Sequence, residues 1–122
     1  MVIEQIPEVR TCRLDQVIRA RLSGPVNSHT IPFFQPRLEG ECSENGITLA
    51  LDLGAADYVD SDGVRWLQRL QAGLAERGGE LRLAVRERSP VERTLNLLQL
   101  DRTFPIERYR DDAAARNLAG ER

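Results

Sequence analysis

Apolar and polar residues alternate along three stretches of the chain, as they do in strands with one buried face. Residues 12–24 place aliphatic residues among arginines until Gly24-Pro25 interrupts the pattern, and they predict one or two strands. Residues 47–53 carry aliphatic side chains at alternate positions with mostly small residues between them, which is typical of a central strand covered on both faces. Residues 80–85 repeat the alternation. These stretches predict the middle of a sheet.

Two longer stretches between these strands have the spacing and the ends of helices. Residues 31–43 follow good N-cap residues and are expected to form a helix that is kinked or loosely wound near Pro36. A second helix is expected from the turn at residues 60–63 to about residue 77, where Gly78-Gly79 ends it. The apolar stripe of this second helix is Trp66, Leu67, Leu70 and Leu74, with Val64 at its edge.

The last third of the chain continues the alternation of helices and strands. Ser89-Pro90-Val91-Glu92 matches a capping box with proline at the first helical position, and it predicts a helix from residue 90 to about 99. The apolar stripe of that helix would be Val91, Thr94, Leu95 and Leu98. A short extended segment is expected at 104–106 and a weak helix over 111–119. Strands that alternate with helices indicate an α/β fold, in the form of an α+β sandwich whose sheet is covered by helices.

Size and charge exclude several classes of protein. The chain has 122 residues, 41% apolar and 30% charged, which predicts one globular domain over 1–122 and excludes a multidomain enzyme. All 17 basic residues are arginines, 19 residues are acidic, and the net charge is −2. A nucleic-acid-binding face needs a clustered basic surplus, whereas acids interrupt every arginine-rich stretch of this chain. No nucleic-acid partner is therefore expected.

Cysteine and histidine usage excludes a zinc site. Cys12 and Cys42 lie 30 positions apart, and His29 is the only histidine. Two free, partly buried thiols in a reducing compartment are expected. The N-terminus has no basic stretch followed by an apolar run, and the longest nearly apolar run, 47–56, is too short to cross a membrane. A cytoplasmic protein without membrane insertion is therefore expected.

Four carboxylates crowd residues 52–62, which is the segment best suited to carry chemistry. Asp52, Asp57, Asp60 and Asp62 lie within eleven residues, and the last two flank Ser61 at the predicted start of a helix. The simplest interpretation is structural: Asp60 and Ser61 cap the helix, and the helix dipole favours Asp62 in its first turn. The sequence predicts neither a metal site nor a cofactor.

An enzymatic alternative starts from the same turn. An apolar strand followed by Asp-x-Asp-Gly resembles the nucleophile motif of haloacid-dehalogenase-type phosphatases. Asp60 would then be the nucleophile and Asp62 the acid/base of a small magnesium-dependent phosphatase. That chemistry also needs a cation for the phosphoryl group and a downstream acidic pair for the metal. The only adjacent pair, Asp111-Asp112, precedes a predicted helix and does not follow a strand, so the motif lacks its context.

Several ordered landmarks together resemble a STAS domain, and in particular the anti-sigma factor antagonist group. They are the strand 47–53, Tyr58-Val59-Asp60-Ser61-Asp62-Gly63, Arg77-Gly78-Gly79 at a helix end, the strand 81–84, Ser89-Pro90, the run 95–102 and Phe104-Pro105-Ile106. The resemblance covers about residues 12–119. It implies a STAS fold with a mixed four- to five-stranded sheet packed against about four helices, and a single STAS domain over 1–122.

The resemblance also implies binding to another protein, without catalysis. In antagonists of this type, a kinase-type anti-sigma factor phosphorylates a hydroxyl residue of the turn, and the unphosphorylated form binds that factor and frees the sigma factor. Ser61 is the phosphorylation candidate, since Asp62 occupies the second hydroxyl position of the turn. The residues expected to contact the partner are Asp60, Ser61, Asp62, Val64, Arg65, Gln68 and Asn27, with Val64, Arg65 and Gln68 on the outer side of the helix.

Two further positions depart from the family pattern, and one alternative stays within the same fold. Asn27 stands where the family usually has aspartate, and Gln99 stands where it commonly has glycine. The alternative is a constitutive interaction subunit, either of a lipid-exporting ABC transporter, whose ATPase subunit would be the partner, or of a stressosome-like scaffold. A phosphoryl group adds about −1.5 to −2 charges, which on Ser61 is enough to reject an acidic or apolar contact. A partner switch in transcription regulation therefore depends on Ser61, whereas a constitutive subunit does not.

Overall fold

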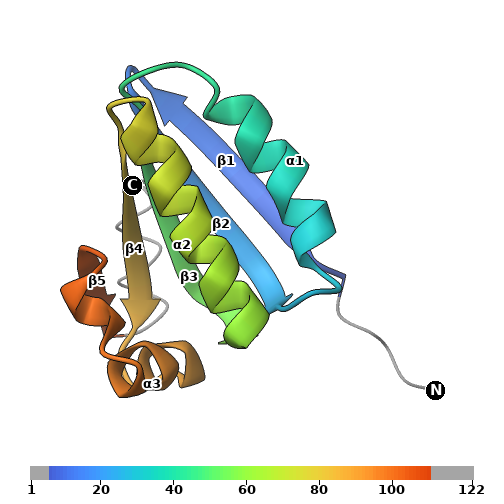
Figure 1. The fold of residues 1–122 in the computed structure, drawn as a ribbon. Helices are drawn as coiled ribbons and strands as arrows, with labels where there is room; N and C mark the ends of the chain where they lie inside the picture. Colours follow the sequence, from blue (N-terminus) through green and yellow to red (C-terminus); the bar gives the residue numbers. More distant parts are fainter. Residues whose placement is uncertain (1–5, 111–122) are drawn as a thin grey trace.

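The computed structural model describes residues 6–110, which form one five-stranded sheet with helices packed against it (Figure 1). The elements are β1 (Glu8–Leu14), β2 (Val17–Val26), α1 (Ile31–Glu41), β3 (Thr48–Val59), α2 (Ser61–Glu76), β4 (Glu80–Arg86), α3 (Pro90–Leu97), η1 (Leu100–Arg102) and β5 (Ile106–Tyr109). β1 pairs antiparallel with β2, and the other neighbours pair in parallel. The predicted α/β fold with a mixed sheet is confirmed. The described residues hold three α-helices and a 3₁₀ helix, against about four helices expected, and the helix predicted over 111–119 lies outside them.

α1 and α2 lie side by side on one face of the sheet and begin at the same end of it (Figure 1). The ring of Phe34 in α1 stacks on that of Trp66 in α2, with 6.1 Å between the ring centroids. Both rings are buried together with aliphatic side chains from alternate positions of the inner strands. These strand residues are Ile18, Ala20, Leu22, Leu49, Leu51, Leu53, Leu81, Leu83 and Val85. The alternation in the sequence therefore marks the face of the sheet that the helices cover.

The strands extend further than the sequence pattern predicts. The region predicted as one or two strands contains two, β1 and β2, and β2 passes through Gly24-Pro25 to Val26. β3 likewise continues beyond residue 53 to Val59. The pairing register of β2 and β3 shifts twice, between Arg21 and Ser23 and between Gly24 and Val26. Such shifts are typical of β-bulges, which allow strand pairing to continue past a proline, a residue that has no N–H to donate. The prediction that Gly24-Pro25 ends the strand is wrong for this reason.

α1 begins where it is predicted, directly after one of the good N-cap residues, and contains Pro36. Thr30 is the N-cap residue, and its side chain makes no cap hydrogen bond. Instead, Asn27 Oδ1 accepts hydrogen bonds from the backbone N–H groups of His29 and Thr30, at 2.9 and 3.1 Å. Thr30 Oγ1 donates to Pro25 O at 2.7 Å. The loop between β2 and α1 is therefore held by side-chain bonds of Asn27 and Thr30.

α3 begins as predicted and ends early. Ser89 Oγ accepts a hydrogen bond from Glu92 N–H at 3.1 Å, in agreement with the predicted cap. The helix ends at Leu97, because Gln99 adopts a left-handed conformation with φ +56°, which most side chains disfavour. Leu98 is 53% exposed, so its assignment to the buried stripe is wrong. The positive φ also explains why glycine suits the position of Gln99.

Candidate partner-binding site

The acidic turn joins β3 to α2 at the end of the sheet where α1 and α2 begin (Figure 1). Asp60 is the N-cap residue, and its Oδ1 accepts a hydrogen bond from Gly63 N–H at 2.9 Å, which confirms the predicted cap. The Asp60 N–H donates to Val26 O at 3.2 Å, so the turn is held against the end of β2. Ser61 is the first residue of α2 instead of a cap, and it is exposed. The turn therefore presents one hydroxyl group to solvent on a backbone that is fixed on both sides.

Gly63 allows the first turn of α2 to approach the sheet closely. A Cβ atom on Gly63 would lie 2.7 Å from Val26 O and 2.7 Å from Val59 Cγ1, well inside ordinary van der Waals contact. Glycine is therefore required here by the packing of α2 on β2 and β3. The position of the Ser61 hydroxyl depends on this close packing, because Gly63 also donates the cap hydrogen bond to Asp60.

The contact residues predicted on α2 do not all lie on its outer side. Arg65 and Gln68 are exposed, as predicted, and Asp62 is half-buried and forms an ion pair with Arg65. Val64 is only 7% exposed, so its predicted position on the outer side of the helix is wrong. The first turn of α2 packs over the ends of β2 and β3, and the buried side of the helix therefore begins at Gly63 and Val64.

Asn27 lies next to the turn although the two are far apart in the sequence. Val26 and Val59 are register partners in β2 and β3, so the residues at the ends of these strands meet at one edge of the sheet. Asn27 Nδ2 donates a hydrogen bond to the Tyr58 hydroxyl at 2.9 Å. Tyr58 is 42% exposed and is not among the predicted contact residues; its place two residues before Asp60 is the signal that points to it.

The four carboxylates of residues 52–62 do not form one cluster. Asp60 caps α2, Asp62 forms an ion pair within α2, Asp57 is exposed on β3, and Asp52 forms its bonds on the sheet. Within the described part of the chain, no three His, Cys, Asp or Glu side chains are grouped so that they could hold a metal ion. The pair Asp111-Asp112 lies outside that part. The geometry gives no support to a phosphatase, in which Asp60 and Asp62 would both have to face one phosphoryl group.

Asp52 connects three strands on the face of the sheet opposite α1 and α2. Its Oδ2 accepts a hydrogen bond from Arg21 Nη1 of β2 at 2.8 Å, and its Oδ1 accepts one from the Tyr109 hydroxyl of β5 at 2.7 Å. A Cβ atom on Gly54 would lie 1.6 Å from the Tyr109 hydroxyl oxygen, so glycine makes room for this bond. Because β4 lies between β3 and β5, the Tyr109 side chain spans a whole strand. Asp52 therefore has a structural role apart from the turn.

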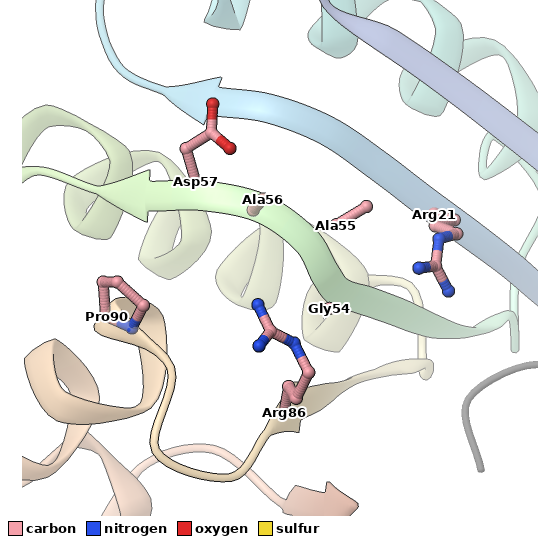
Figure 2. A pocket seen from close by; sticks show the side chains of 7 residues that line it. All are labelled: Arg21, Gly54, Ala55, Ala56, Asp57, Arg86 and Pro90. Atoms are coloured by element: carbon pink, nitrogen blue, oxygen red, sulfur yellow. The ribbon is translucent and has the colours of Figure 1, made fainter. Parts of the chain in front are cut away.

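An open hollow of about 380 Å³ lies beside this network (Figure 2). Its lining residues are Arg21, Gly54, Ala55, Ala56, Asp57, Arg86 and Pro90. Figure 2 shows Arg21 from β2 and Arg86 from β4 on either side of β3. The charge of Arg21 is balanced by Asp52, and Asp57 adds a carboxylate at the rim. The hollow therefore has no strong preference for an anion, and none of the residues predicted to bind a partner lines it.

The Tyr109 hydroxyl makes stability depend on pH in the alkaline range. Burial, the hydrogen bond to Asp52 and the charge of that carboxylate raise the pKa of Tyr109 above its usual value. Above the unfolded tyrosine pKa of about 10, the unfolded chain releases this proton and the folded chain keeps it. The free energy of unfolding is therefore expected to fall by up to about 1.4 kcal/mol per pH unit above pH ~10.

Urea denaturation at several pH values between about 8 and about 11 would measure this effect in the wild type and in Tyr109→Phe. The variant should be less stable at neutral pH by about 1.5–3 kcal/mol, because it loses a hydrogen bond to a charged acceptor. Its stability should also fall less steeply above pH ~10, since the raised tyrosine pKa is gone. An equally steep decline in both proteins would contradict the assignment to Tyr109.

The two cysteines are the remaining candidates for chemistry, and both are free thiols. Cys12 is exposed, Cys42 is buried, and both are free, so the prediction of two free thiols is confirmed, although Cys12 is more exposed than expected. Burial raises the pKa of the Cys42 thiol.

Among residues 6–110, no helix has the length and apolar character needed to cross a membrane.

The comparisons with known proteins agree with the fold. The family model of the STAS domain matches residues 8–113. An anti-sigma factor antagonist from Mycobacterium paratuberculosis is 24% identical with a TM-score of 0.74, and the match covers 90% of this chain and 92% of that one. A putative anti-sigma factor antagonist from Thermotoga maritima is 19% identical with a TM-score of 0.68, covering 91% and 94%.

A third structure is that of the anti-sigma factor antagonist SpoIIAA in its unphosphorylated form. It is 14% identical with a TM-score of 0.62, and the match covers 95% of this chain and all of the other. No curated protein gives a significant match. At these identities the solved structures establish a common fold, and the family match confirms the resemblance that the ordered landmarks of the sequence indicate.

Proposed function

Because the chain belongs to the STAS domain family, we propose that it is a non-catalytic, protein-binding module that acts as an anti-sigma factor antagonist in a partner-switching pathway. The observation that carries the proposal is the exposed Ser61 hydroxyl on the capped N-terminus of α2. Arg65 and Gln68 extend the same exposed side of the helix. The partner in this role is a kinase-type anti-sigma factor in the cytoplasm.

The same geometry supports regulation by phosphorylation of Ser61. The side chain is exposed, so a kinase can reach it, and the start of α2 tolerates a negative charge. A phosphoryl group would add about −1.5 to −2 charges between two carboxylates and carry a tightly held water shell. A partner surface that contacts Ser61 closely would lose that contact. The unmodified chain is therefore the form that binds.

Two measurements on the purified chain test this proposal. Incubation with a kinase-type anti-sigma factor and ATP should add the mass of one phosphoryl group to the wild type and none to Ser61→Ala. In a binding assay with the same anti-sigma factor, Ser61→Glu should raise Kd by about tenfold, since a charge enters the contact. Ser43→Glu is the matched control, because Ser43 is exposed just after the far end of α1, and it should leave affinity within about twofold. No phosphorylation together with unchanged binding by Ser61→Glu would refute the switch.

One observation favours a constitutive binding subunit as the second candidate. Asp62 places a permanent carboxylate directly after Ser61, and it forms an ion pair with Arg65 in the unmodified chain. A subunit of a lipid-exporting ABC transporter or of a stressosome-like scaffold needs no change at Ser61. Stable co-purification with an ATPase subunit, by both the wild type and Ser61→Ala, would be the result that supports this candidate over an anti-sigma factor antagonist.

A further inference from the structure

We propose that residues 111–119 of this chain bind, as an amphipathic helix, in a groove on the face of the sheet opposite α1 and α2. The groove is open and has a volume of about 740 Å³. Side chains of β2, β3, β4 and β5 line it together with Pro105, and no residue of a described helix does so. Parallel strands are ordinarily covered on both faces. The described residues therefore leave this face of the sheet for a further element.

The floor of the groove consists of small side chains between longer, charged ones. Ala50 of β3 and Ala84 of β4 are both half-buried and both line the groove. Ala50 is the register neighbour of Arg19 in β2 and of Arg82 in β4. Ala84 is the register neighbour of Glu107 in β5. Because an alanine side chain ends at Cβ, the two alanines form a depression that a helix with small side chains can approach closely.

The described chain ends beside this groove. Arg86 of β4 and Tyr109 of β5 are register partners, and Glu87 N–H donates a hydrogen bond to Tyr109 O at 2.7 Å. The Tyr109 hydroxyl donates to Asp52 Oδ1 at 2.7 Å, on the same face of the sheet as the groove. Residue 111 follows only two positions later. The segment therefore starts at the groove and needs no long connection to reach it.

The sequence of residues 111–119, which lie outside the described part, fits the floor of the groove. A helix over this range has Ala114, Ala115 and Leu118 on one side. Seven helical residues advance about 10 Å, as far as about three strand residues. A helix that starts at the end of β4 and runs back along this strand therefore brings Leu118 level with Ala84. Its side towards the sheet is apolar and mostly small, as the floor requires.

The charges at the start of the segment agree with this direction. Asp111 and Asp112 come directly after the end of β5, and Arg86 lies at the neighbouring end of β4. Figure 2 shows Arg86 and Arg21 on either side of β3, and Arg21 pairs with Asp52 on the face that carries the groove. Carboxylates are favoured both near a guanidinium group and in the first turn of a helix. A helix that begins here places its acidic end beside Arg86 and its apolar side over the alanines.

Alkylation by iodoacetamide of a thiol in the floor of the groove tests this contact in the full-length chain. Ala84→Cys supplies the thiol, and the exposed Cys12 of β1, outside the groove lining, is the reference in the same sample. A thiol covered by residues 111–119 should react at least about tenfold more slowly than Cys12. Adding Leu118→Ser should raise its rate about tenfold, because the contact loses its largest apolar side chain. Ala113→Ser, on the other side of the helix, is the matched control and should change the rate by less than about twofold.

The other outcomes refute the contact. If Leu118→Ser leaves the rate unchanged, or Ala113→Ser raises it equally, residues 111–119 do not cover the groove. If the thiol is protected only at high protein concentration, a second copy of the chain covers the groove instead. Circular dichroism checks the fold of each variant, and Ala50→Cys provides a second position in the floor if Ala84→Cys does not fold. Because the groove and α2 lie on opposite faces of the sheet, none of these results decides the proposed function.

Discussion

Phe34→Ala is expected to lower the free energy of unfolding by about 3–5 kcal/mol. Phe34 is fully buried and stacks on Trp66, so the substitution removes apolar contacts and leaves a cavity between α1 and α2. Urea denaturation followed by circular dichroism would measure the change, with a shifted midpoint at an unchanged m value. The loss should be among the largest for any single substitution in this chain, because it weakens the contact between the two helices of one layer.

The adjacent residue provides the control for this substitution. Phe33→Ala removes a side chain of the same chemistry that is 64% exposed, and stability should change by no more than about 0.5 kcal/mol. Equal losses of stability for Phe33→Ala and Phe34→Ala would show that the buried face of α1 is not the one that carries Phe34. The pair therefore compares a buried and an exposed phenylalanine at neighbouring positions of one helix.

Gly63→Ala is expected to lower the free energy of unfolding by about 1–3 kcal/mol, which is the usual cost of overpacking. The new Cβ would lie 2.7 Å from Val26 O, a backbone atom that cannot move without disturbing β2. The first turn of α2 would have to move away from the sheet, and the Asp60 cap and Ser61 would move with it. Binding to a partner should therefore weaken along with stability.

Gly73→Ala in the same helix serves as the control. A Cβ on Gly73 has nothing within 4 Å, so only the helix preference of alanine remains, and the variant should be more stable by about 1 kcal/mol. Opposite signs for these two substitutions would show that the cost at residue 63 comes from the contact with β2. If Gly63→Ala also stabilises the chain, the close approach of α2 to the sheet is refuted.

The sequence predicts those parts of the fold that depend on local periodicity. The alternation in residues 47–53 and 80–85 gives β3 and β4, and the cap residues Asp60 and Ser89 mark the starts of α2 and α3. These predictions are correct because each of them depends only on backbone geometry within a few residues. The choice of Phe34 over Phe33 as a core residue is also encoded locally, by the spacing of buried Ile31, Phe34 and Leu38 along α1.

The features that the sequence pattern does not predict depend on contacts between segments that are far apart in the chain. The bulges that carry β2 and β3 past Gly24-Pro25 exist only in the pairing of the two strands. The periodicity of α2 places Val64 only at the edge of the apolar stripe, and Val64 is buried because the first turn of α2 packs over the sheet. The bond between Asn27 and Tyr58 likewise follows from the register of β2 and β3.

The order of the strands has a consequence for the kind of ligand that this fold can accept. From β2 to β5, each described strand lies next to its predecessor, always on the same side. Right-handed βαβ crossovers that progress in one direction place their helices on a single face, as α1 and α2 are placed (Figure 1). A doubly wound sheet reverses direction, and the reversal opens the crevice in which nucleotides bind. Among these five strands there is no such reversal, so the described sheet lacks the crevice in which a doubly wound sheet binds a nucleotide.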